Sequence, residues 1–81
     1  MNFTQHALDK LELYEIDRDV VEKSSAIHTF YDKTQNTDIK IVRITGILFV
    51  LVLDPDTENF ITIYRTDQRT IDNRRKAKRW I

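Results

Sequence analysis

The sequence predicts a single α+β domain in which two N-terminal helices pack on a four-stranded antiparallel sheet, followed by a short basic C-terminal helix. Three observations support this prediction. Apolar residues recur at helical spacing in residues 3–14, strand-like segments and turn signals alternate over 27–65, and cations crowd residues 67–81. Because a chain of 81 residues is the size of one domain, residues 1–81 are expected to share one core.

The N-terminal region has the pattern of two short helices. Thr4 is a suitable N-cap, and the apolar stripe beside it has spacings of three and four, formed by Phe3, Ala7, Leu8, Leu11 and Tyr14. Asp17 is expected to cap a second helix, which makes its apolar contact through Val20 and Val21. This helix should end near residues 24–25, because two serine hydroxyls there compete for backbone hydrogen bonds.

Three strands are predicted in the middle of the chain. Residues 27–31 form the first, and a polar turn follows at 33–38. The second strand, 39–45, alternates, and its two faces carry Ile39 and Ile41 against Val42 and Ile44. After a tight turn at Gly46, residues 47–53 are apolar on both faces, which is typical of a central strand covered on both sides.

A further turn and a returning strand complete the predicted sheet. Asp54-Pro55-Asp56-Thr57 is a turn, because proline fixes φ at its second position and aspartate accepts local backbone hydrogen bonds. The last strand, 60–65, is expected to place Phe60, Thr62 and Tyr64 on one face and Ile61, Ile63 and Arg65 on the other. This order predicts helices on one face of the sheet. Residues 67–79 can add a short helix with few apolar contacts, namely Ile71, Ala77 and Trp80.

Charge is divided unevenly along a chain that is formally neutral. Residues 65–81 hold seven cations against two carboxylates, a net of +5, and residues 1–64 balance them with a net of −5. Such a split indicates an anionic partner for the basic end. The segment combines a basic cluster with one aromatic residue, which is the composition of a nucleic-acid contact. The candidate RNA- or DNA-binding residues are Arg69, Arg74, Arg75, Lys76, Lys78 and Arg79.

Another interpretation of the basic segment is a solvated helix end. Its cations would then complement the helix dipole and the acidic N-terminal helices. Trp80 is expected to pack on the sheet or across a dimer interface rather than on a base.

Three short motifs resemble the RelE/ParE-like toxin superfamily, and in particular its small RelE-like domains. They are His6-Ala7-Leu8-Asp9-Lys10 in the first helix, Glu15-Ile16-Asp17 before the second, and Ile61-Thr62-Ile63-Tyr64-Arg65-Thr66 at the end of the last strand. The resemblance covers residues 3–66. It implies a RelE-like fold, an activity on messenger RNA without a metal, and a cognate antitoxin as partner.

The resemblance also directs attention to five candidate catalytic residues. His6 and Lys10 lie four apart on one helix face, where a histidine can transfer protons and a lysine can neutralise charge. Arg43 and Arg65 would stabilise the charge that develops on a phosphate, and Tyr64 would stack on or orient a base. Arg43 is expected to share a groove with Arg65, and its alternative role is an ion pair with a carboxylate.

Several classes of function are not indicated by the sequence. It has no cysteine and two histidines, so we expect no metal site and no cofactor. The N-terminus lacks the pattern of a signal peptide and no apolar run is long enough for a membrane span, so we expect a cytoplasmic protein. Two alternatives to an RNA-cleaving toxin remain open. One is a non-catalytic, regulatory nucleic-acid-binding homodimer, and the other is a protein-interaction module.

Overall fold

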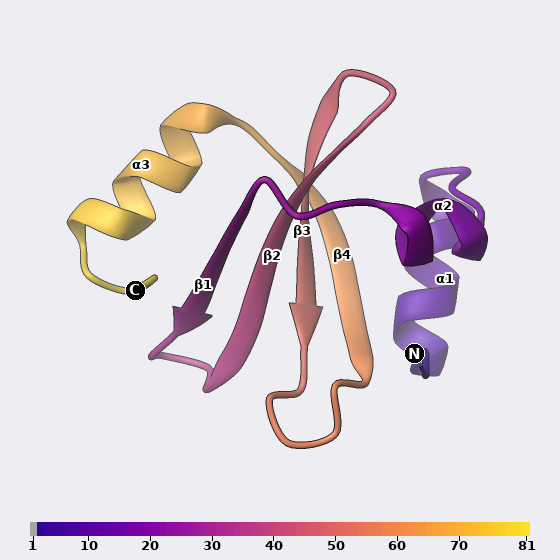
Figure 1. Ribbon diagram of the computed structural model, residues 1–81, viewed down its shortest axis with the longest axis horizontal. Coiled ribbons are helices and arrows are strands. Elements are labelled where there is room, and N and C mark those ends of the chain that lie inside the picture. The colour runs from indigo at the N-terminus through magenta and orange to yellow at the C-terminus, as the bar shows by residue number, and fades with distance from the viewer. Residues whose placement is uncertain (1) are drawn as a thin grey trace.

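The computed structural model describes residues 2–81. In chain order its elements are helices α1 (Gln5–Leu13) and α2 (Arg18–Lys23), strands β1 (His28–Asp32), β2 (Thr37–Ile44), β3 (Ile47–Leu53) and β4 (Phe60–Thr66), and helix α3 (Gln68–Lys76). Figure 1 shows the sheet in the middle, with α1 and α2 on one side and α3 on the other.

The four strands form an antiparallel meander in the order β1-β2-β3-β4. The predicted α+β class and four-stranded antiparallel sheet are therefore confirmed. The predicted central strand is also confirmed, since β3 lies between two neighbours and residues 49–53 are buried on both of its faces.

Local hydrogen bonds fix the turns. The predicted turn after β3 is confirmed, since Asp54 Oδ1 accepts the backbone N–H groups of Asp56 at 2.8 Å and Thr57 at 3.1 Å. Thr45 and Gly46 join β2 to β3 with φ of 50° and 80°, the left-handed pair that suits the twist of a two-residue hairpin. Thr4 caps α1 by accepting the Ala7 N–H at 3.1 Å, whereas Asp17 precedes α2 without a capping side-chain bond.

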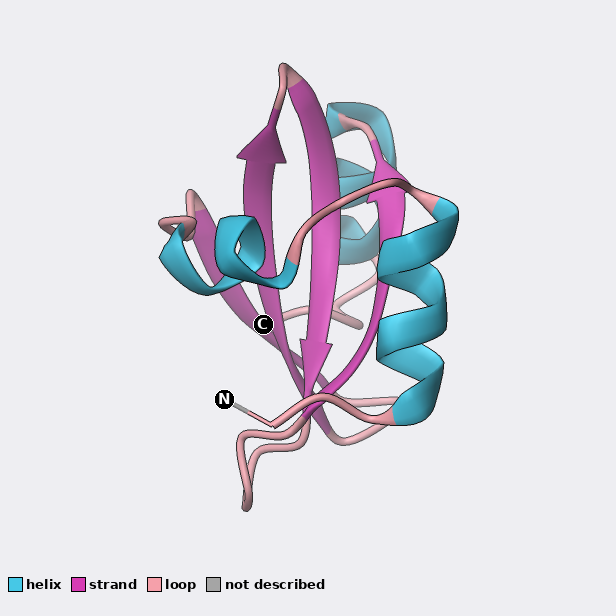
Figure 2. Ribbon diagram, turned by 90° about the vertical axis from the view of Figure 1, so that its right-hand side faces the viewer, coloured by secondary structure: helices cyan, strands magenta, loops and turns pink. Residues whose placement is uncertain are grey.

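Two apolar cores lie on opposite faces of the sheet. The first core joins Ala7, Leu11 and Val21 of α1 and α2 to one face. The second core joins Ile71 of α3 and Trp80 to the other face. In Figure 2, α1 and α2 lie in front of the sheet and α3 lies behind it.

The prediction that the helices share one face is therefore wrong for α3. Strands β2 and β3 turn four apolar side chains toward that side, and these are Ile39, Ile41, Val50 and Val52. Such a surface must be removed from water, and only the C-terminal segment remains to cover it.

A bulge in β4 corrects the predicted faces of that strand. Val52 pairs with Thr62 and Leu53 with Phe60, so Ile61 is an extra residue. Phe60 therefore joins Ile63 in the first core, while Ile61 packs with Tyr64 against the second. Strict alternation from residue 60 was wrong because the bulge shifts the pattern by one position.

Candidate nucleic-acid interface

Helix α3 carries most of the basic residues and begins at a well-formed cap. Asp67 accepts the Thr70 N–H at 2.8 Å, and this bond lowers the pKa of its carboxyl. The last turn of the helix contains three cations, Arg74, Arg75 and Lys76, which complement the negative end of its dipole. Ile71 is the only buried residue of α3, so the helix is held in place mainly by residues 77–81 after its last turn.

The chain then reverses and docks on the outer edge of β1. Lys78 adopts φ of 58°, which turns the backbone after α3. Tyr31 and Ile81 exchange two backbone hydrogen bonds of 2.8 and 3.0 Å, and the Lys33 N–H donates to the Arg79 carbonyl at 2.9 Å. Trp80 between them is 2% exposed. The end of the described chain is therefore part of the fold.

Asp32 is the polar centre of this docking. Its Oδ2 accepts the indole N–H of Trp80 at 3.1 Å and Nε–H of Arg79 at 3.2 Å, while Oδ1 accepts the backbone N–H groups of Thr34 and Gln35. Burial raises the pKa of this carboxyl, but the bonds from Gln35, Trp80 and Thr34 and the charge of Arg79 outweigh it, so the pKa is lowered.

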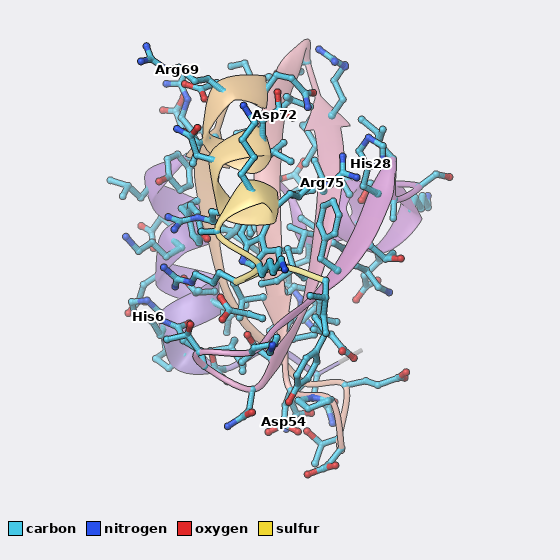
Figure 3. The ribbon with its side chains drawn as sticks, turned by 90° about the vertical axis from the view of Figure 1, so that its left-hand side faces the viewer. His6, His28, Asp54, Arg69, Asp72 and Arg75 are labelled. Atoms are coloured by element: carbon cyan, nitrogen blue, oxygen red, sulfur yellow. The ribbon has the colours of Figure 1, made fainter. Side chains whose placement is uncertain are left out.

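An open groove of about 470 Å³ separates α3 from β1, and we call it the α3–β1 groove. Its lining consists of Phe30, Asp72, Arg75, Lys76, Trp80 and Ile81. Phe30 stacks between His28 and Trp80, with centroid separations of 5.9 and 5.6 Å. The guanidinium of Arg75 lies 5.6 Å from the Phe30 ring centroid, and Figure 3 shows Arg75 directed from α3 toward β1. Cations thus border an aromatic surface.

The six predicted nucleic-acid contacts fall into two groups. Four are exposed, namely Arg69, Arg75, Lys76 and Lys78, and none has a carboxylate within 4.0 Å among residues 2–81. The other two serve the fold. Arg79 pairs with Asp32, and Arg74 covers the Trp80 ring at 5.4 Å from its centroid.

The five predicted catalytic residues do not converge. His6 is exposed and Lys10 half-buried on α1, and Figure 3 shows His6 at the end of the molecule opposite Arg69. Arg65 turns toward α1 and α2, where it lines a cavity with Tyr14. Two candidates lie on the other face, so the expected groove shared by Arg43 and Arg65 does not exist.

These two residues make different local contacts. Arg43 reaches the Gly46 carbonyl at 3.4 Å, and the expected alternative of an ion pair with a carboxylate is not formed among the described residues. Tyr64 packs against the second core, where burial raises its pKa.

The sequence interpretation missed the contribution of β1. His28, Phe30 and Asp32 alternate, so they share the face that receives Trp80. That spacing was visible in the sequence, but nothing local joined it to a tryptophan 48 positions from Asp32.

Comparisons with known proteins find no family model, curated protein or solved structure that matches this chain. The resemblance to the RelE/ParE-like superfamily therefore stays a prediction. No helix within residues 2–81 is long and apolar enough to cross a membrane. The same part of the chain holds no group of three His, Cys, Asp or Glu residues that could bind a metal ion.

Proposed function

We propose that this protein binds RNA or DNA through α3 and the neighbouring edge of β1. The observation that carries the proposal is the α3–β1 groove, where Arg75 and Lys76 border the exposed parts of Phe30 and His28. Phosphates need accessible cations, and unpaired bases need aromatic or guanidinium planes on which to stack.

The charge of this region supports the same function. The four exposed cations lie within ten positions, and each is free of an ion pair within the described chain. Asp72 is the carboxylate in the groove lining, and it accepts the Gln68 amide at 3.0 Å. The groove therefore keeps a net positive charge, which attracts a polyanion over about one Debye length, roughly 8–10 Å.

We favour binding without catalysis over an RNA-cleaving toxin. Metal-free cleavage needs a proton-transferring group and charge stabilisers around one phosphate. His6 and Lys10 lie on α1, while Arg43 lies on the opposite face of the sheet. A cognate antitoxin and a homodimer, both expected from the sequence, stay predictions.

The test measures the affinity of a labelled oligonucleotide at several salt concentrations, for RNA and DNA in single-stranded and duplex form. We expect log K to fall linearly with log salt, by about 0.7–0.9 per phosphate contact. The triple variant Arg69→Gln, Arg75→Gln, Lys76→Gln should reduce this slope by about two to three contacts. These side chains are exposed, so the fold should be kept.

Lys23→Gln is the matched control, because Lys23 is an exposed cation at the end of α2 on the other layer. An unchanged slope in the triple variant, or an equal loss in the control, would refute the proposal. RNA incubated with the protein should remain intact. Cleavage that His6→Ala abolishes would replace this proposal with the toxin hypothesis.

A further inference from the structure

A second cavity lies on the other face of the sheet, away from α3. It has a volume of about 220 Å³ and opens between the α1–α2 connection, the β2–β3 turn and the end of β4. Its apolar walls include Tyr14, Ile16, Ile44, Ile47 and Phe49, and Tyr14 meets Phe49 edge to face at 5.5 Å between centroids. Drug-sized ligands occupy pockets of roughly 300–1,000 Å³, so a smaller molecule fits this one.

Three charged residues line this apolar cavity. Arg65 approaches from β4, and Glu15 and Asp17 approach from the α1–α2 connection. None of the three forms an ion pair within 4.0 Å among residues 2–81. The side chain of Asp17 makes no capping bond to α2 either. A cation and two carboxylates are therefore available beside one apolar cavity.

The backbone is strained at two positions of this cavity. Glu15 has φ of 57° and Thr45 has φ of 50°, although glycine is the usual residue in that region and β-branched residues avoid it. Such conformations cost of order 1–3 kcal/mol each and cluster at functional sites. Here they bring Glu15 and Thr45 to opposite sides of the opening.

We propose that this cavity binds a small apolar amino acid in its zwitterionic form. The apolar side chain enters between Tyr14 and Phe49, the carboxylate pairs with Arg65, and the ammonium pairs with Glu15 or Asp17. An arginine fork suits a carboxylate, and the two acidic side chains disfavour a polyanion. The site thus differs in chemistry and in position from the α3–β1 groove, and it does not depend on nucleic-acid binding.

The test is a titration of the labelled protein with L-phenylalanine, followed by amide chemical shifts. We expect saturable shifts in residues 14–17 and 44–47. Phenylpropionate lacks the ammonium, phenethylamine lacks the carboxylate, and glycine lacks the apolar side chain. Each should bind at least about tenfold more weakly, since one charge-assisted hydrogen bond is worth that much.

Arg65→Gln should weaken L-phenylalanine at least about tenfold, whereas Arg69→Gln on the other side of the sheet should leave its affinity unchanged. Equal affinity for phenylalanine and phenethylamine would overturn the proposal, as would the absence of saturable shifts. The comparison of the four small molecules uses the unaltered protein, so it decides the question even if a variant does not fold.

Discussion

Replacing Asp32 with asparagine should destabilise the fold more than any other substitution of a turn aspartate. The side chain keeps its shape, so Oδ1 can still accept the N–H groups of Thr34 and Gln35. The new amide NH₂ then takes the place of Oδ2 and faces the N–H groups of Trp80 and Arg79. Two acceptor contacts become contacts between donors.

The magnitude can be worked out from these two contacts. Loss of a hydrogen bond to a charged acceptor costs about 1.5–3 kcal/mol, and a buried donor without a partner costs about 1–3 kcal/mol. The Trp80 indole is buried and pays the second cost in full, whereas Arg79 is 31% exposed and can turn to water. We therefore expect a loss of about 2–4 kcal/mol in the free energy of unfolding.

Urea denaturation measures this loss as a lower midpoint with an unchanged slope. Asp54→Asn is the matched control, since Asp54 also accepts two turn N–H groups through Oδ1 but has no tryptophan or arginine partner. Trp80→Phe, which removes the indole N–H, should make the two Asp32 variants more alike. A loss for Asp32→Asn no larger than that for Asp54→Asn would show that the carboxylate does not hold the C-terminal segment in place.

Two further predictions concern the same fold. The pKa of Asp32 is lowered because its hydrogen bonds outweigh burial, so its stabilisation is complete above its unfolded pKa of about 3.9 and is lost as pH falls through the folded value; the stability difference between the unaltered protein and Asp32→Asn, measured in urea, should be constant from about pH 5 to 7 and shrink below about pH 4. Hydrogen exchange should be slowest in β3, where both faces are buried, and fast in residues 33–36; equal rates in the two segments would contradict the assignment of β3 as the central strand.

The sheet was predictable because its signals are local. Residues 47–53 are apolar on both faces, and the sequence of the following turn contains the residues that form its hydrogen bonds. The bulge at Ile61 was not predictable, since its only cause is the pairing of Leu53 with Phe60 across a loop. One shifted position was enough to move Phe60 to the opposite core.

The basic segment was predictable as a charge pattern but not as a site. The sequence shows which residues are cationic, but it does not show which of them find partners inside the protein. Arg79 finds Asp32 and Arg74 finds the Trp80 ring, both through contacts of the docked segment. The five catalytic candidates failed to converge for a related reason, because strand alternation separates Tyr64 from Arg65 and puts Arg43 on the face opposite Arg65.

The docking of the C-terminal segment also decides how nucleic-acid binding can be tested. Deleting residues 74–81 removes the Trp80 ring from the second core and leaves Asp32 without Arg79, so a lost affinity would report unfolding as well as lost contacts. Charge-neutralising substitutions at Arg69, Arg75 and Lys76 avoid this problem because those side chains are exposed. The net charge of +5 over residues 65–81 overstates the charge that a ligand meets, since Arg79 is already neutralised by Asp32. The expected salt dependence is therefore set by the exposed cations and not by the full count.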